Sequence, residues 1–282
     1  MPEYILTLRC PDTAGIVHAV SAGLLASGSN ILEQAQFTDP ELGVFCLRTR
    51  FESPVDAVDD VRAALDAELA RFSPDLSLRR RDAHRRVLVM VSRFDHCLAD
   101  LLYRRALGEL HVDVPVVVSN HEDCRALVES YGVPFVHVPV TAGTKPAAEQ
   151  RLRDLVREHD VDVVVLARYM QVLSDAFCAD MPGRIVNIHH SFLPGFKGAR
   201  PYHQAHERGV KLIGATCHYA TGELDAGPII DQEVIRVEHF HTPDDLVRLG
   251  RDCERLALAR SVRWHLDDRV LIHGNKSIVF RD

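Results

Sequence analysis

The sequence has no cysteine pair in a C-x-x-C arrangement, no long apolar run and no excess of basic residues. Its seven cysteines are scattered and odd in number, which excludes a disulfide framework and is typical of reduced core residues. A membrane-spanning helix needs about 18 consecutive apolar residues, and a secretory signal needs a basic segment followed by an apolar one. Because the sequence shows neither pattern, we expect a cytoplasmic protein with no membrane partner.

The charge balance excludes another class of partner. Forty acidic residues stand against 33 basic ones, which gives a formal net charge of -7. A nucleic-acid-binding surface needs a concentration of positive charge, so nucleic acid is not expected as a ligand. The basic stretch RRRDAHRR at residues 79–86 is interpreted as a solvated linker.

The first eighty residues predict a small domain of mixed helix and strand. Strand and helix patterns follow one another in the order β-α-β-β-α-β, which is the ferredoxin-like plan. In the first helical stretch, Ile16, Val20 and Leu24 recur at helical spacing. Asp12 is the expected cap of this helix and Ser53 that of the second.

A length of 282 residues favours two domains, here residues 1–83 and 84–282. In the second domain, runs of Val and Leu alternate with helical stretches. This pattern is typical of an α/β fold with a mostly parallel sheet covered on both faces, as in Rossmann-like domains. Two strands joined through TGELDA and a last strand, KSIVF, follow later in the chain. The expected helices cover residues 97–107, 122–131, 146–158, 174–180 and 243–265.

Polar side chains gather where the strand RIVNIHH ends. Alternate residues share one face of a strand, so Asn187 and His189 should point the same way. The carboxyl ends of strands border the ligand crevice of an α/β sheet, and Asn and His supply the donors that a developing oxyanion needs. Asp225, in a loop between two later strands, could orient His189 or take a proton from water. Structural explanations also exist, since Asp is a common turn former and a strand-end histidine can simply be packed.

The same segment admits two other chemistries. A serine hydrolase would combine Ser191 with Asp225 and either His189 or His190, but no G-x-S-x-G motif surrounds the serine. A metal site could be built from His189, His203, His206 and Asp225. The chain has no H-E-x-x-H motif and no cysteine pair, so we expect neither a nucleophilic serine nor a bound metal.

Four motifs in succession resemble the folate-dependent formyltransferase superfamily. They are LARYMQVLS, NIHHSFLP, GARPYHQA and LDAGPII, between residues 166 and 230. In that superfamily the Asn, the His two residues later and the Asp before A-G-P form the catalytic trio, and these correspond to Asn187, His189 and Asp225. The resemblance also implies that the pterin of the folate lies beside Arg168, Tyr169, Met170, Gln171, Val172, Leu173 and Gly222.

The segment SRFDHCLADLL, residues 92–102, distinguishes two reactions within the superfamily. Glycinamide ribonucleotide formyltransferases hold the substrate phosphate here with a Gly/Ser-rich loop. Without glycine the backbone cannot approach a phosphate closely, and Asp95 would repel the anion. The segment is instead similar to that of the formyltetrahydrofolate deformylase family, and the N-terminal domain resembles an ACT regulatory domain. One departure is Gln171, where other members often carry a basic residue.

The resemblance implies hydrolysis of 10-formyltetrahydrofolate by water to formate and tetrahydrofolate, which would supply formate for purine synthesis. No metal or other cofactor is expected. The alternatives are formyl transfer to glycinamide ribonucleotide and an inactive protein that only binds an effector.

The ACT-like domain is expected to bind a small amino acid near Asp12, Gly15 and Ile16. Glycine permits a close strand-to-helix turn, and the N-terminus of the helix attracts a carboxylate. The alternative is a purely structural or dimerising module. Exposed sheet edges in such a module also predict a homo-oligomer.

Overall fold

The computed structural model describes residues 1–195 and 201–282. Its internal contacts divide the chain into two compact units. The first contains Met1–His84, Asp267–His273 and Ile278–Asp282, and the second contains Arg85–Leu266 and Gly274–Ser277. The break after residue 84 lies beside the boundary drawn from the sequence. The sequence assigned residues 84–282 to the second domain. In the structure, most residues after Leu266 pack with the first unit instead.

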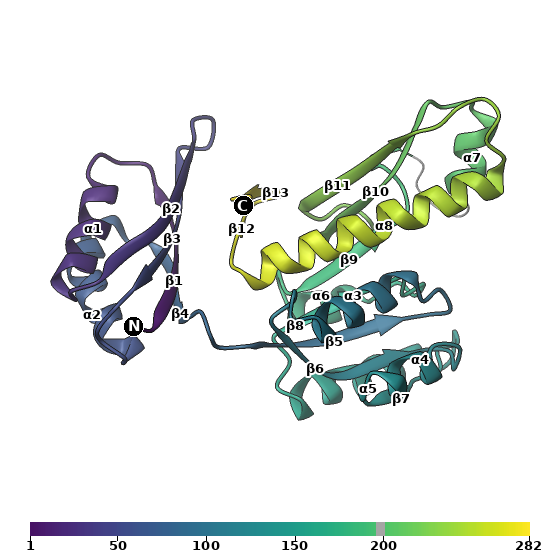
Figure 1. Ribbon diagram of the computed structural model, residues 1–282, viewed down its shortest axis with the longest axis horizontal. Coiled ribbons are helices and arrows are strands. Elements are labelled where there is room, and N and C mark those ends of the chain that lie inside the picture. Colours follow the sequence, from purple (N-terminus) through teal and green to yellow (C-terminus); the bar gives the residue numbers. More distant parts are fainter. Residues whose placement is uncertain (196–200) are drawn as a thin grey trace. The chain divides into compact units, whose positions relative to one another are not determined.

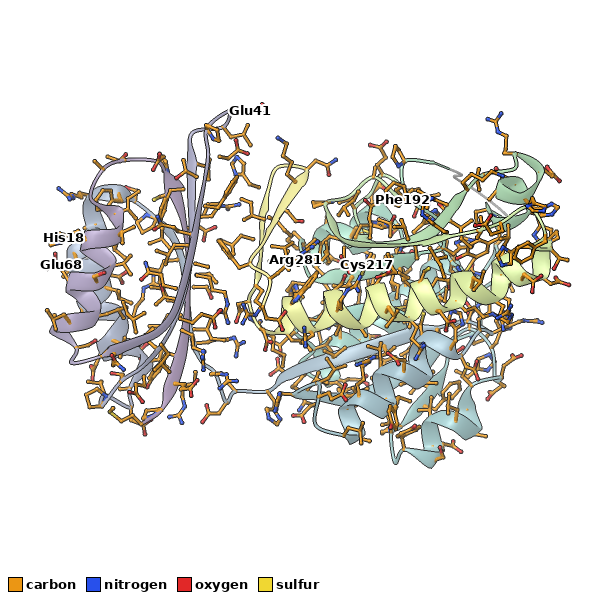
Figure 2. The ribbon with its side chains drawn as sticks, turned by 45° about the horizontal axis from the view of Figure 1, so that its top comes forward. His18, Glu41, Glu68, Phe192, Cys217 and Arg281 are labelled. Atoms are coloured by element: carbon orange, nitrogen blue, oxygen red, sulfur yellow. The ribbon has the colours of Figure 1, made fainter. Side chains whose placement is uncertain are left out.

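The first unit is a four-stranded antiparallel sheet with two helices on one face (Figure 1). The strand order β2-β3-β1-β4 and the β-α-β-β-α-β succession confirm the ferredoxin-like plan. His18 and Glu68, on the two helices, point away from the sheet (Figure 2). The elements are β1 (Glu3–Pro11), α1 (Ile16–Ala26), β2 (Asn30–Asp39), β3 (Val44–Glu52), α2 (Val58–Leu69), the 3-10 helix η1 (Ala70–Phe72) and β4 (Asp75–Arg80).

Alternation along β1 explains which face the helices cover. Tyr4, Leu6 and Leu8 are fully buried in one cluster with the apolar stripe of α1. Burial of each such side chain contributes about 1.5–3 kcal/mol. The expected caps were wrong: α1 begins after Gly15, α2 begins after Ala57, and no side chain caps either helix. Both helices begin later than their sequences suggested, too far from Asp12 and Ser53 for a capping hydrogen bond.

The opposite face of this sheet is charged and contacts the C-terminal segment. Arg48 is 2% exposed and donates to the Asp267 carbonyl oxygen at 3.1 Å. Arg269 forms an ion pair with Glu33 at 3.0 Å. Because a buried guanidinium needs partners, these contacts explain why C-terminal residues belong to the first unit.

The second unit contains a seven-stranded, mostly parallel sheet, which confirms the expected fold class. The strand order is β11-β10-β9-β8-β5-β6-β7, and β10 alone runs in the opposite direction, antiparallel to both of its neighbours, β9 and β11. The strands are β5 (Arg85–Val91), β6 (Val112–Ser119), β7 (Phe135–His137), β8 (Val163–Leu166), β9 (Ile185–His189), β10 (Leu212–Tyr219) and β11 (Ile229–Arg236). A separate hairpin contains β12 (Val270–His273) and β13 (Lys276–Val279).

Helices cover the sheet of the second unit, and α8 packs along β9, β10 and β11 (Figure 1). The helices are α3 (His96–Ala106), α4 (Arg125–Ser130), α5 (Lys145–Glu158), α6 (Asp175–Asp180), α7 (Pro201–Glu207) and α8 (Pro243–Leu266). The sequence did not predict β7 or β12, since such short elements carry little periodicity. All seven cysteines are buried and unpaired, as expected.

The central strands fix the position of the candidate site. β8 is buried along its whole length, and β5 is buried from Val87 onward. On one face, Leu88, Val164 and Ile185 pack in one cluster with α5 and α6 residues. β8 and β9 therefore end at neighbouring points of a rigid sheet edge, and the loops that follow them share one crevice.

Candidate active site

A cavity of about 530 Å³ opens at the carboxyl ends of β8 and β9. Met170 and Val172 are half exposed in it, and exposed apolar side chains in a concave surface indicate a ligand-binding wall. The cavity is lined by every residue to which the sequence assigned catalysis or folate binding: Arg168, Tyr169, Met170, Gln171, Val172, Leu173, Asn187, His189, Gly222 and Asp225.

Asp225 lies between two histidines. Its Oδ2 is 3.2 Å from Nδ1 of His189, and its Oδ1 is 3.5 Å from Nε2 of His218. Burial alone would raise the pKa of Asp225, but its contacts with the two histidines, first of all His189, lower it well below its usual value. Its φ of 54° lies in the left-handed region, which Asp tolerates better than most residues. Asp225 is therefore both a turn residue and the carboxylate partner of His189.

His218 belongs to the same cluster and was not predicted from the sequence. Its Nδ1 donates to the Tyr219 carbonyl oxygen at 2.9 Å, so its Nε2 can accept from the Asn187 amide, which is 3.1 Å away. In the antiparallel register of β9 and β10, His218 lies directly opposite Asn187. A polar residue near the end of the apolar strand KLIGATCHYA was the available signal. The sequence does not show the register of β9 and β10, which is what places His218 opposite Asn187.

Ser191 contacts the second ring nitrogen of His189. Its Oγ lies 2.8 Å from Nε2 and donates to the Gly195 carbonyl oxygen at 3.0 Å. A carbonyl oxygen only accepts, so the hydroxyl proton points to Gly195, and Nε2–H donates to Oγ. Nδ1 faces the Asp225 carboxylate and donates as well. This network therefore holds the His189 ring at both of its nitrogens.

Ser191 contacts His189, and His189 contacts Asp225, as in the triad of a serine hydrolase. The position of Ser191 distinguishes the two mechanisms. Ser191 is 3% exposed and does not line the cavity. Its hydroxyl proton is directed at a backbone oxygen instead of at His189. A nucleophilic serine must reach the substrate and lose its proton to the histidine, so the geometry argues against this role.

A buried ion cluster forms another wall of the cavity. Glu254 is 1% exposed and lies 2.8 Å from His96 Nε2, 2.8 Å from the Tyr202 hydroxyl and 3.2 Å from Arg168 Nε. Burial alone would raise the pKa of Glu254, but the hydrogen bond from His96 and the charge of Arg168 lower it. Two hydrogen-bond donors and the charge of Arg168 therefore hold this carboxylate in its charged form.

His190 lies between the cluster and the catalytic candidates. Its ring centroid is 5.2 Å from that of His189 and 6.4 Å from that of Tyr202. Burial, together with the positive charge of Arg168, lowers the pKa of His190 to about 4. The side chain is therefore neutral near pH 7.

The potential metal ligands do not meet as the rival hypothesis required. Within residues 1–195 and 201–282, the one group with suitable spacing is His96, Cys97 and Glu254. Burial raises the pKa of the Cys97 thiol well above its usual value, and Glu254 is already occupied by donors. This group does not fit a metal ion. His203 lines the cavity, His206 does not, and the start of GARPYHQA lies outside the described residues.

The three residues proposed for an effector lie in the first unit, at the start of α1. The Asp12 N–H donates to the Gly43 carbonyl oxygen at 2.8 Å, and Ile16 is buried. Gly15 has a φ of 100°, and a Cβ atom there would lie 2.8 Å from Nη2 of Arg71. A glycine is therefore required at this turn, and a guanidinium lies beside it.

Comparison with known proteins identifies the family of this chain. The formyl transferase family model matches residues 85–262. A formyltetrahydrofolate deformylase of Corynebacterium sp. (strain P-1) is 49% identical and covers 99% of this chain and 98% of its own length. That of Bacillus subtilis (strain 168) is 46% identical, over 98% of this chain and 93% of its own length. No helix in the described part of the chain is long and apolar enough to span a membrane.

Solved structures distinguish the two branches of the family. A crystal structure of a formyltetrahydrofolate deformylase from Pseudomonas syringae has a TM-score of 0.96 and 47% identity, and covers 100% of this chain and 95% of its own. Glycinamide ribonucleotide transformylase 1 from Symbiobacterium toebii has a TM-score of 0.66 and 31% identity, and covers 70% of this chain and 95% of its own. Of these two structures, the deformylase matches the whole chain, and the transformylase matches only part of it. The chain therefore belongs to the formyltetrahydrofolate deformylase family.

Proposed function

We propose that this protein hydrolyses 10-formyltetrahydrofolate, with water as the second reactant, to formate and tetrahydrofolate. The observation that carries the proposal is the Asp225–His189 pair beside Asn187, inside a cavity with an apolar wall. The similarity to deformylases over nearly the whole chain supports the same reaction. The formate would supply purine synthesis.

The apolar wall is proposed to hold the pterin of the substrate. Tyr169 and Leu173 are buried, and Met170 and Val172 present half-exposed side chains next to Gln171. Gly222 lies in the loop on another side of the same cavity. An apolar wall with a few polar groups is typical of a site for a flat heteroaromatic ring.

The catalytic steps follow from the donors beside this wall. The water oxygen attacks the formyl carbon, and the carbonyl oxygen becomes an oxyanion that accepts hydrogen bonds from Asn187 and from protonated His189, whose Nδ1–H is then shared between Asp225 and the oxyanion. Such preorganised donors typically contribute a few kcal/mol to lowering the barrier. Asp225 holds His189 as the imidazolium or takes the proton of the attacking water. The C–N10 bond then breaks, N10 receives a proton through His189 or a water, and formate leaves.

The proposed reaction requires no metal or other cofactor. Water supplies the nucleophile, and His189 and Asp225 supply the proton transfers. Adding divalent metal ions or a chelator is therefore expected to leave the rate of hydrolysis unchanged.

Release of formate from 10-formyltetrahydrofolate by the purified protein tests the proposed function. Release without any amine acceptor is expected, and it would exclude a protein that only binds an effector. Formyl transfer to glycinamide ribonucleotide, with no formate release in its absence, would instead favour the transferase reaction.

We further propose that the first unit binds a small amino acid at the start of α1 and that the protein forms a cytoplasmic homo-oligomer. The amide groups at the start of α1 and the nearby Arg71 guanidinium suit a carboxylate. Calorimetric titration with glycine and methionine should show heat and a change in activity. Light scattering at micromolar concentration should give a mass above that of one chain.

A further inference from the structure

Arg168 combines two unfavourable features in the wall of the cavity. Its φ is 65°, in a region that residues with a bulky side chain rarely occupy, and its side chain is 8% exposed. Burying a guanidinium is unfavourable unless its N–H groups have partners. A strained backbone and a buried charge at the edge of a reaction site indicate a functional requirement.

The partners present satisfy only part of this guanidinium. Arg168 Nε lies 3.2 Å from Glu254 Oε2, but the N–H does not point at the carboxylate, so the contact is an ion pair and not a hydrogen bond. Glu254 also receives the hydrogen bonds of His96 and Tyr202. Each oxygen of Glu254 accepts one of these bonds. No hydrogen bond to a described residue satisfies Nη1 or Nη2 of Arg168.

A second guanidinium lines the same cavity and contacts the same aromatic ring. Arg251, on α8, lines the cavity, and no described residue forms an ion pair with it. The central carbons of Arg168 and Arg251 are each 5.6 Å from the centroid of the Phe94 ring. Two cations and the single carboxylate of Glu254 leave an excess of positive charge, while the neighbouring His190 is neutral. The local charge therefore suits one monovalent anion.

We propose that Arg168 and Arg251 form a carboxylate-binding subsite, and that its occupant is the formate produced by the reaction. The inference rests on the proposed function. Hydrolysis joins the water oxygen to the formyl carbon, breaks the C–N10 bond and leaves one carboxylate. The terminal N–H groups of a guanidinium match the two oxygens of a carboxylate. One side chain, that of His190, lies between this subsite and His189. Formate can therefore move from His189 to the subsite before leaving the cavity.

The glutamyl part of the folate is a second source of the same chemistry. Its carboxylates would also suit two guanidinium groups. Formate is favoured because Arg168 is buried, and a small anion can reach a buried guanidinium that a long, solvated tail would approach only from the mouth of the cavity.

Binding of sodium formate to the folate-free protein tests the subsite, by saturation-transfer NMR with sodium chloride at equal ionic strength as the reference. In Arg168→Gly the residue keeps its left-handed turn, because glycine favours a positive φ. We expect its dissociation constant for formate to rise by at least about tenfold, the scale of a lost charge-assisted hydrogen bond. Arg251→Gln, at an exposed position where folding is not at risk, should weaken formate binding in the same direction.

Arg255→Gln is the matched control, because Arg255 lies on the same helix but does not line the cavity. It should bind formate like the wild type. The proposal is overturned if the wild type shows no saturable binding, or if Arg168→Gly and Arg251→Gln bind formate as tightly as the wild type. Because the measurement needs no turnover, a protein that binds formate but releases none from 10-formyltetrahydrofolate would contradict the proposed function alone.

A second arm compares 10-formyltetrahydrofolate with 10-formyltetrahydropteroate, which lacks the glutamyl carboxylates. If formate is the occupant, Arg168→Gly should keep the wild-type ratio of KM values for the two substrates. If the variant loses that discrimination while its affinity for formate is unchanged, formate is overturned as the occupant and the site belongs to the substrate's glutamyl carboxylate.

Discussion

Oδ2 of Asp225 lies 3.2 Å from Nδ1 of His189, and this contact joins the loop before β11 to the last residue of β9. Ser191 contacts the other ring nitrogen at 2.8 Å, so the ring is held from both sides. A fixed imidazole beside the cavity is a suitable hydrogen-bond donor for a developing oxyanion. The negative charge of Asp225 orients this ring, which makes the charge the first target for mutation.

Asp225→Asn removes the charge and keeps the shape of the side chain. We expect folding to be retained, since Asn also tolerates the left-handed backbone of this residue. The value of kcat for formate release should fall by at least about two orders of magnitude, the usual scale of general-base and oxyanion effects. KM should change much less, because the pterin contacts are elsewhere. A folded variant that releases formate at nearly the parental rate would remove Asp225 from the mechanism.

His218 is predicted to act by positioning Asn187 and Asp225. His218→Leu removes the acceptor for the Asn187 amide, so kcat should fall by about tenfold, the scale of one lost hydrogen bond at a site of developing charge. His218→Gln can accept from the same amide and should recover part of the activity. If both variants lost the same activity and the same thermal stability, the role of His218 would be packing only.

Ser191→Ala separates the proposed mechanism from that of a serine hydrolase. The structure predicts a loss of about tenfold or less, because the hydroxyl only orients His189. Loss of a nucleophile typically lowers kcat by a factor of about a million. Steady-state rates and mass spectrometry of the quenched wild-type enzyme check the prediction, and a covalent formyl-serine adduct would contradict it.

His190 predicts a dependence of stability on pH. Its pKa is about 4 in the folded protein against an ordinary 6.5, so the folded state binds this proton more weakly than the unfolded state. Stability from this group is therefore fully present above about pH 6.5 and is lost as the pH falls towards 4. The loss amounts to at most about 3 kcal/mol.

Denaturant unfolding at pH 7 and pH 4.5, for the wild type and for His190→Gln, measures this loss. The free energy of unfolding should decrease more on acidification in the wild type than in the variant, which has no proton to gain at this position. Equal decreases in the two proteins would show that His190 is not the group responsible.

Several features of the candidate site could be predicted from the sequence. The spacing of Asn187 and His189 on one strand places both at the same edge of a sheet, and the four motifs relate Asp225 to them. The succession of strands and helices similarly fixed the ferredoxin-like and mostly parallel sheets. These features depend on local periodicity and on residues close together in the chain.

The tertiary structure alone decided the contacts between distant segments. His218 meets Asn187 because β10 pairs antiparallel with β9 in one register, and Glu254 meets Arg168 because α8 packs along the sheet. The C-terminal residues likewise joined the first unit through the buried Arg48. Register and helix docking are set by packing and by the partners of buried charges over the whole domain, so no local pattern specifies them. The residue types and their order along each strand came from the sequence, and the pairing of their side chains came from the fold.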